Sequence, residues 1–166
     1  MFELKRLHRD AVPAALEKAQ RYRLLNEPLE AESIGLDVLE ADPDNAEALA
    51  TLVLALSDQF ERRLGDKFEQ AMALLARFKS DYERQYYEGI LCERRAKVSL
   101  SQAGPGSGSV AYPWFRRAME CFEAAQAIRP AGNDDAILRW NTCARILNRN
   151  PSVVPASDDD ANTMLE

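Results

Sequence analysis

Turn-forming residues recur along the chain and divide its first 148 residues into segments of helical length. Pro13 and Pro28 each stand where a proline opens a helix without loss of an intrahelical hydrogen bond. Alanine and leucine supply 45 of the 166 residues, whereas valine, isoleucine and threonine supply 15. Such a balance favours helices over pleated sheets. We therefore expect an all-α fold, with helices over residues 10–25, 28–41, 44–60, 67–78, 81–100, 112–128 and 134–148.

Three of the expected helix boundaries carry specific signals. Asp44 is placed to cap the helix that follows it, with Glu47 reaching back as in a capping box. Gly65 is expected to end that helix and to separate it from the next one. Residues 104–109 are rich in glycine and serine and have the composition of a flexible linker. The helix after this linker is expected to begin at about Tyr112.

One residue pattern marks the helix that precedes the last turn of the chain. Ala118, Phe122, Ala125 and Pro130 follow one another with the spacing Ala-x3-Phe-x2-Ala-x4-Pro. This pattern resembles the second helix of a tetratricopeptide repeat, a helix–turn–helix unit with a period of 34 residues. The match at all four positions predicts that the chain is built from repeated helix pairs.

A second segment shows the same interval between an alanine and a proline. Ala31 stands twelve residues before Pro43, while Gly35 and Val38 depart from the phenylalanine and the alanine of the pattern. In the helix before this segment, Ala19 and Tyr22 resemble the small and the aromatic position of a first repeat helix. These residues together define the first expected repeat.

The middle repeat is expected to be irregular. Ala46 and Leu49 resemble the start of its first helix, with Leu49 in place of the usual tryptophan. Ala71, the small residue of its second helix, comes about six residues later than a 34-residue period places it. We therefore expect a longer turn at residues 62–66.

The resemblance implies a right-handed superhelical stack of antiparallel helix pairs, with about three repeats of the tetratricopeptide type and a closing helix. Each pair leaves an apolar flank that the next repeat covers. The repeat domain would span residues 12–148, with a flexible insert at residues 101–111, after an N-terminal segment at residues 1–11. Residues 149–166 are expected to form an acidic, disordered tail.

Charge and hydropathy restrict the partners that we expect. The net charge is −6, and residues 151–166 hold four acidic and no basic residues, so the rest of the chain is nearly balanced. It lacks the broad basic surface that nucleic-acid binding requires. The longest apolar stretch, residues 48–56, is far shorter than the roughly 20 residues of a membrane span, and the N-terminus has no apolar signal region. We expect a cytoplasmic protein that binds neither nucleic acid nor membrane.

Residues that could carry catalysis or bind a metal are scarce. His8 is the only histidine, and no orienting partner for it is recognisable in the sequence. Cys92, Cys121 and Cys143 lie far apart, without the spacing of a metal site, and we expect them to be reduced and buried. The sequence therefore predicts no enzyme, no cofactor and no metal.

The resemblance implies a non-catalytic scaffold that binds a protein segment in a concave groove. Arginine doublets at residues 62–63, 94–95 and 116–117 favour an acidic partner. Relatives that dock chaperones hold carboxylates with Lys and Asn at first-helix positions, where this chain has Leu16 and Gln20, so we expect no carboxylate clamp. The candidate groove residues are Gln20, Arg23, Tyr86, Arg94, Thr142 and Arg145.

Two alternatives stay open at this point. The chain could be a dedicated cytoplasmic chaperone of one partner protein. It could also be a regulator or an enzyme that binds a small ligand, which would need convergent polar groups in a concave pocket. The sequence does not fix the oligomeric state. The three aspartates at residues 158–160 could compete with an acidic partner for the arginines.

Overall fold

A computed structural model describes residues 2–102 and 104–156 of the chain, and in this part it contains seven α-helices and no strand. The expected all-α class is therefore confirmed. The helices fall into two compact units, Met1–Lys79 and Ser80–Glu166. The sequence prediction of one repeat domain over residues 12–148 differs from this division, and each unit is described by itself below.

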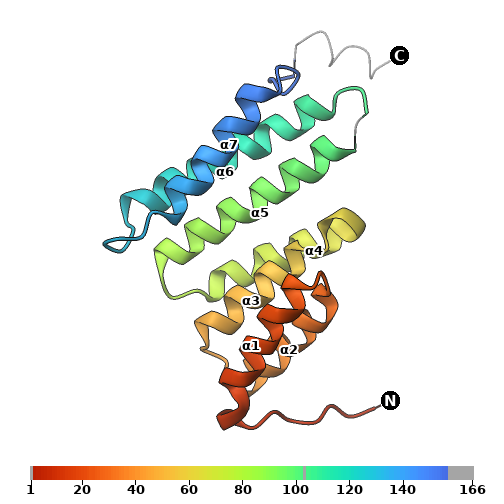
Figure 1. Ribbon diagram of the computed structural model, residues 1–166, viewed down its shortest axis with the longest axis vertical. Coiled ribbons are helices and arrows are strands. Elements are labelled where there is room, and N and C mark those ends of the chain that lie inside the picture. Colours follow the sequence, from red (N-terminus) through yellow and green to blue (C-terminus); the bar gives the residue numbers. More distant parts are fainter. Residues whose placement is uncertain (1, 103, 157–166) are drawn as a thin grey trace. The chain divides into compact units, whose positions relative to one another are not determined.

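Unit 1 consists of two antiparallel helix pairs and two short 3₁₀ turns (Figure 1). Each helix packs against the next one along the chain, and the first helix of one pair also contacts the first helix of the other. This second contact is the arrangement expected of consecutive repeats. The elements are η1 (Arg9–Ala11), α1 (Val12–Leu24), α2 (Pro28–Ala41), α3 (Ala46–Ser57), α4 (Phe60–Leu74) and η2 (Leu75–Arg77).

Small side chains let the helices of unit 1 approach one another closely. Ala19, Ala31 and Ala55 are fully buried and form one cluster from three different helices. A β-carbon added at Gly35 would lie 3.2 Å from the Cβ atom of Leu52. Gly35, which departs from the repeat pattern, therefore gives α3 room to lie against α2.

Two expected boundaries in unit 1 differ from the structure, one by a single residue and the other by seven residues. Asn45, not Asp44, caps α3, because its Oδ1 atom accepts a hydrogen bond from the backbone N–H of Ala48 at 2.8 Å. The expected break at Gly65 is also wrong. Helix α4 already begins at Phe60, and its non-helical residue is Arg63, with φ −144° and ψ 54°.

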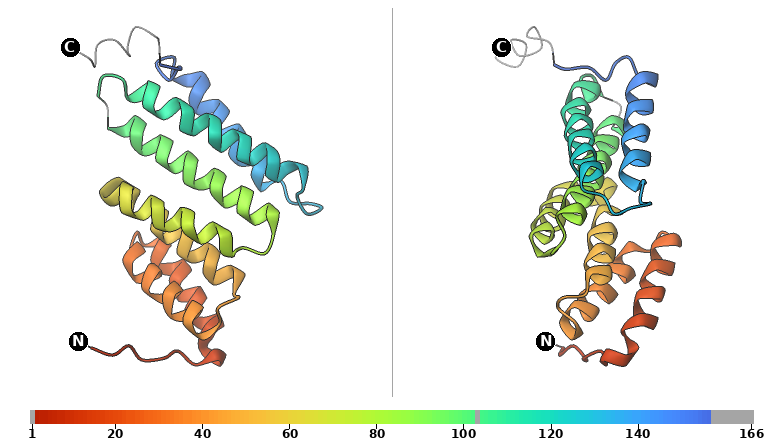
Figure 2. Two further views of the ribbon diagram at one scale, coloured as in Figure 1. Left: turned by 180° about the vertical axis from the view of Figure 1, so that it is seen from behind. Right: turned by 90° about the vertical axis from the view of Figure 1, so that its left-hand side faces the viewer.

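Unit 2 contains the helices α5 (Asp81–Ser101), α6 (Ser107–Ala127) and α7 (Asp135–Arg149). The two long helices α5 and α6 run antiparallel over their length, and α7 packs against α6 (Figure 2). Gly89 of α5 lies under the ring of Phe122, because an added β-carbon would stand only 2.5 Å from the Cε1 atom of that ring. The interface between α5 and α6 therefore depends on the missing side chain at this position.

The flexible insert expected at residues 101–111 is much shorter in the structure. Helix α5 extends to Ser101, and α6 begins at Ser107, several residues before the expected start at Tyr112. Gly106, with φ 80°, takes the left-handed conformation at the N-cap of α6. Residues 107–111 are helical, and the turn before them is limited to residues 102–106, of which residue 103 is not described.

The first part of the expected disordered tail is packed against α6. Val153 is buried, and its N–H donates to the carbonyl oxygen of Asn150 at 2.9 Å. Gly108 lies against the backbone of Ser152, since an added β-carbon would stand 2.1 Å from the Ser152 carbonyl oxygen. The prediction for residues 149–166 is thus wrong for residues 149–153, while residues 157–166, with the three aspartates, lie outside the described residues.

Candidate protein-binding site

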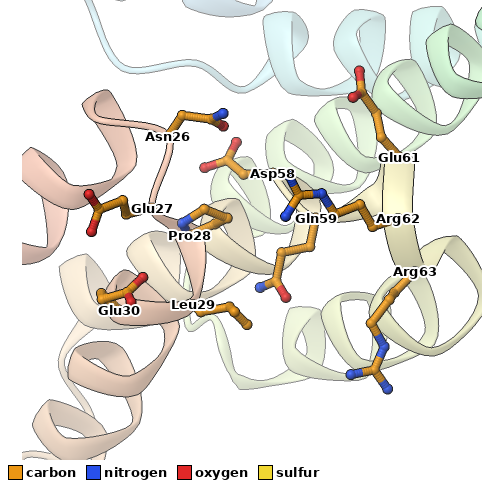
Figure 3. A pocket seen from close by; sticks show the side chains of 10 residues that line it. All are labelled: Asn26, Glu27, Pro28, Leu29, Glu30, Asp58, Gln59, Glu61, Arg62 and Arg63. Carbon is orange, nitrogen blue, oxygen red and sulfur yellow. The ribbon is translucent and has the colours of Figure 1, made fainter.

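A depression in unit 1 lies between the turn that joins α1 to α2 and the turn that joins α3 to α4. It has a volume of about 340 Å³ and is bordered by the α1–α2 turn and by the α3–α4 turn (Figure 3). This volume is at the lower end of the roughly 300–1,000 Å³ of ligand pockets. The lining residues are Asn26, Glu27, Pro28, Leu29, Glu30, Asp58, Gln59, Glu61, Arg62 and Arg63.

The first wall is a tightly bonded turn. Asn26 has φ 59°, and its N–H donates to the carbonyl of Arg23, while the N–H of Glu27 donates to the carbonyl of Tyr22. These two bonds form a Schellman motif, which ends a helix with one left-handed residue. Pro28 then opens α2 at its first turn. The break that the sequence predicts at residues 26–28 is therefore confirmed, and it fixes the wall.

The second wall is formed by the first turn of α4. Both Arg62 and Arg63 donate their backbone N–H groups to the carbonyl of Gln59. Because the backbone at Arg63 is not helical, the side chains of Arg62 and Arg63 point in different directions (Figure 3). In Figure 3 the guanidinium of Arg62 points back toward Gln59, whereas the side chain of Arg63 points the other way. The guanidinium of Arg63 bonds instead to Asp66, at 2.9 Å.

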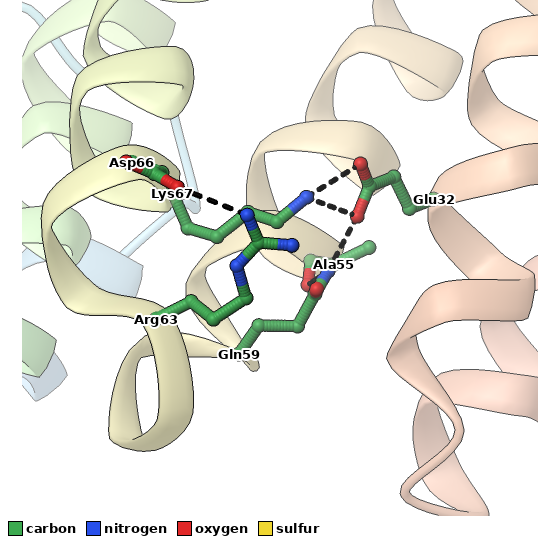
Figure 4. A network of polar contacts seen from close by, with 6 residues as sticks. All are labelled: Glu32, Ala55, Gln59, Arg63, Asp66 and Lys67. Atoms are coloured by element: carbon green, nitrogen blue, oxygen red, sulfur yellow. Dashed lines mark hydrogen bonds and ion pairs between the residues drawn. The ribbon is translucent and has the colours of Figure 1, made fainter.

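Ion pairs between the two helix pairs hold the walls in place. Arg23 binds the carboxylate of Asp58 through two nitrogens, at 2.7 and 3.3 Å. The buried amine of Lys67 donates to both oxygens of Glu32, at 2.7 and 2.9 Å, and the amide of Gln59 donates to the same carboxylate (Figure 4). Lys67 and Gln59 are buried polar residues, and both donate to Glu32; Gln59 also donates to the carbonyl of Ala55 at 3.0 Å. The base of the depression is therefore fixed by electrostatic bonds rather than by side chains free to move.

The two groove residues predicted in unit 1 serve these contacts. Arg23 pairs with Asp58, as described, and the amide of Gln20 donates to the carboxylate of Glu47 at 2.9 Å. Both bonds join α1 to α3. These two residues tie one helix pair to the next, and their partners could not be recognised in the sequence because they stand 27 and 35 positions away.

The four groove residues predicted in unit 2 have different surroundings. Tyr86 is half-buried and lies in an aromatic group, stacked on Tyr82 at 5.7 Å between ring centroids. Thr142 donates to the carbonyl of Leu138 within its own helix, and Arg94 is half-buried. Arg145 alone is exposed.

A buried carboxylate lies beside the aromatic group of unit 2. Glu93 is 0% exposed, and it pairs with Lys97 one helical turn away and with Arg139 of α7 at 3.4 Å. Burial raises the pKa of Tyr86, an effect that the nearby guanidinium of Arg139 opposes. Because the carboxylate of Glu93 pairs with one cation of α5 and one of α7, we interpret this network as a link between the two helices.

The remaining predicted features are structural. Cys92, Cys121 and Cys143 are buried, and burial raises the pKa of each thiol to about 12. A thiol with so high a pKa is a poor nucleophile at neutral pH. Trp140 is half-buried and donates its indole N–H to Glu123 at 2.9 Å.

Members of the arginine doublets are largely engaged within the chain. Arg63 binds Asp66, Arg95 lies 3.8 Å above the ring of Trp114, and Arg117 binds Glu88. Among the residues that the structure covers, Arg62 and Arg116 have no side-chain partner. The doublets therefore do not present a joint cationic surface for an acidic partner.

Unit 1 thus places a bordered depression on two stacked helix pairs. Comparison of the chain with protein-family models, with curated proteins and with solved structures finds no match. Within residues 2–102 and 104–156, no helix is long and apolar enough to cross a membrane, and no three metal-binding side chains gather at one point.

Proposed function

We propose that this chain is a non-catalytic helical-repeat scaffold whose unit 1 binds a segment of another protein chain. In this proposal the helices form a superhelical stack of the tetratricopeptide type, as the sequence pattern implies. The observation that carries the proposal is the group of exposed leucines beside the depression. Leu24 is 88% exposed, and Leu25 and Leu29 are each 60% exposed.

The exposure of these leucines is costly unless a partner covers them. In this proposal the three leucines, which lie within six positions of the sequence, form one apolar patch, and contiguous exposed apolar patches mark interaction sites. Each leucine that a partner buries contributes about 1.5–3 kcal/mol to binding before the entropic costs of association. The turn between them is rigid, so little further ordering is needed on this side of the interface.

The periodicity of the contacts in unit 1 supports the repeat part of the proposal. Lys67 bonds to Glu32 and Arg23 bonds to Asp58, each across 35 positions, and Arg77 bonds to the carbonyl of Pro43 across 34 positions. Contacts between equivalent elements of adjacent repeats recur at the repeat length. A period of 34 residues is that of the tetratricopeptide repeat.

A site-specific photo-crosslink tests the proposal directly. A photoreactive amino acid at position 29, in the apolar patch, is expected to form an adduct with a protein in cell extract. The same amino acid at position 36 is the matched control, because Leu36 is also an exposed leucine of α2 but does not line the depression. Equal adduct patterns from both positions, or none from position 29, would contradict the proposal. Adducts with small molecules alone would favour the alternative of a ligand-binding regulator.

A further inference from the structure

Two exposed features of unit 1 have complementary chemistry. The first is the N-terminal segment, residues 2–8, which forms neither helix nor strand. Phe2 is fully exposed and Leu4 is 81% exposed. Glu3 lies between them, and Lys5 and Arg6 follow, so residues 2–6 carry one acidic and two basic side chains. The second is the depression described above, which Leu29 lines and which the exposed Leu24 and Leu25 directly precede in the sequence. An apolar, basic segment and an apolar depression with charged walls thus occur in the same molecule.

The charges around the depression suit a basic segment. Among its lining residues, Asp58 is matched by Arg23, and Arg63 is matched by Asp66. Four charged side chains remain for which the described residues offer no partner. Three of these are acidic and one is basic, which leaves the walls with two uncompensated negative charges; the four are Glu27, Glu30, Glu61 and Arg62.

Most of this segment cannot reach the depression of its own chain. The segment is held at Arg9, whose Nε atom donates to the carbonyl of Ala41 at 3.1 Å. Leu4 stands five residues before this anchor and reaches at most about 18 Å from it. Helix α1 alone, which separates the anchor from Asn26, has 13 residues and a length of about 20 Å. Phe2, seven residues before the anchor, reaches at most about 25 Å, but Leu4, Lys5 and Arg6 fall short of the depression of their own chain. Residues 2–6 can therefore bind there as a whole only between two molecules.

We propose that residues 2–6 of one copy of the chain bind in the depression of a second copy. Phe2 and Leu4 pack against the leucines of the α1–α2 turn, and Lys5 pairs with the acidic walls. Arg6 exchanges its exposed pair with Glu40, at 3.9 Å, for a pair with the same walls. The proposal rests on the binding site of the proposed function and assigns it an occupant. The segment and the depression lie at opposite ends of α1. If each of two molecules places its segment in the depression of the other, a closed dimer forms. If each molecule binds the segment of a different neighbour, an open head-to-tail assembly forms.

The first experiment measures binding of a labelled synthetic peptide with the sequence of residues 2–9 to the full-length chain by fluorescence anisotropy. We expect saturable binding that weakens between about 50 and about 500 mM salt. A chain with Glu27→Lys and Glu30→Lys is expected to bind at least about tenfold more weakly. The matched control, with Glu17→Lys and Glu69→Lys, carries the same charge change at exposed positions outside the depression and should bind as the unchanged chain does.

A charge exchange separates a direct contact from a general effect of net charge. A peptide with Lys5→Glu and Arg6→Glu should bind the Glu27→Lys, Glu30→Lys chain better than it binds the unchanged chain. In parallel, sedimentation of the full chain from about 5 to about 500 μM should show self-association that Phe2→Ser with Leu4→Ser abolishes. Failure of the peptide to bind, or a monomer at every concentration, overturns this inference. The crosslink from position 29 to a different protein would then still support the proposed function.

Discussion

The close approach of Gly89 to Phe122 gives the sharpest prediction, because the contact of one added methyl group decides whether Gly89→Ala raises or lowers the free energy of unfolding. A β-carbon at Gly89 would stand 2.5, 2.7 and 3.0 Å from three atoms of the Phe122 ring. The ring is 0% exposed and lies near the ring of Tyr86, so it cannot turn into solvent. We therefore expect Gly89→Ala to destabilise unit 2.

The magnitude follows from two opposing effects. Replacing a glycine with alanine inside a helix gains about 1 kcal/mol, because the unfolded chain loses conformational freedom. Forcing a methyl group into a packed core costs about 1–3 kcal/mol. The contact with three ring atoms places Gly89→Ala at the upper end, so the net loss is about 2 kcal/mol. In a unit of this size that loss lowers the melting temperature by about 10 °C.

The same substitution elsewhere provides the control. Gly65 is also inside a helix, but nothing lies within 4 Å of an added β-carbon there. Gly65→Ala should therefore stabilise unit 1 by up to about 1 kcal/mol. The two effects can be measured separately, because both tryptophans, Trp114 and Trp140, belong to unit 2 and report its unfolding by fluorescence. Circular dichroism reports the helices of both units.

Two results for Gly89→Ala would contradict this reasoning. If Gly89→Ala raised the urea midpoint of the fluorescence transition, as Gly65→Ala should raise that of unit 1, then α5 and α6 would not approach each other at this glycine. If Gly89→Ala left the midpoint unchanged, the cost of the added methyl group would be only the 1 kcal/mol or so that the helix gains. The predicted fall of about 2 kcal/mol would then be wrong.

Three further predictions concern the polar contacts, the thiols and the C-terminal segment. Lys67→Met leaves the carboxylate of Glu32 without its cation and should lower the free energy of unfolding, measured by circular dichroism, by about 2 kcal/mol. Adding Glu32→Gln should recover most of this loss, and no recovery would mean that the two side chains do not couple. The three thiols have a pKa of about 12 in the folded chain and an ordinary value of 9.0, so their contribution to stability is complete below pH 9.0 and is lost as the pH rises toward 12. The urea midpoint by tryptophan fluorescence should fall between pH of about 8 and about 10.5, and less in a chain whose cysteines are alanines. Gly108→Ala should displace Ser152 and expose residues 150–156 to protease, whereas Gly104→Ala, whose nearest neighbour is 4.0 Å away, should not; equal cleavage of both would argue against the packed segment.

Local signals allowed most helix boundaries to be predicted from the sequence. The break at Pro28 and the stop before Pro43 are properties of a few neighbouring residues, and the structure has α2 over the expected residues. The start of α6 was misjudged because the glycines at residues 104–108 look alike in composition. Gly108 is a glycine for a different reason, since the backbone of Ser152 lies against it. That contact joins positions 44 residues apart, and no local pattern reports it.

The candidate site was harder to predict than the fold for the same physical reason. The charges of Arg23 and Arg63 are visible in the sequence, but their partners depend on how the helices pack. Arg23 was expected to face a ligand, and it instead binds Asp58 across the two helix pairs. An arginine at an interface between repeats and one in an open groove have the same local neighbours. Only the identity of the opposite carboxylate distinguishes them.

If unit 1 is the repeat array that we propose, the irregularity expected in its middle repeat accounts for the depression. The late position of Ala71 predicts about six additional residues between the helices of that repeat. In the structure these residues form an additional helical turn at the start of α4, which ends at the non-helical backbone of Arg63. That turn carries Glu61 and Arg62, the second wall of the depression. A repeat of regular length would end its turn before these side chains and leave the leucines of the α1–α2 turn on an open edge. Under this proposal the departure from the expected repeat pattern, rather than the pattern itself, creates the surface to which we assign binding.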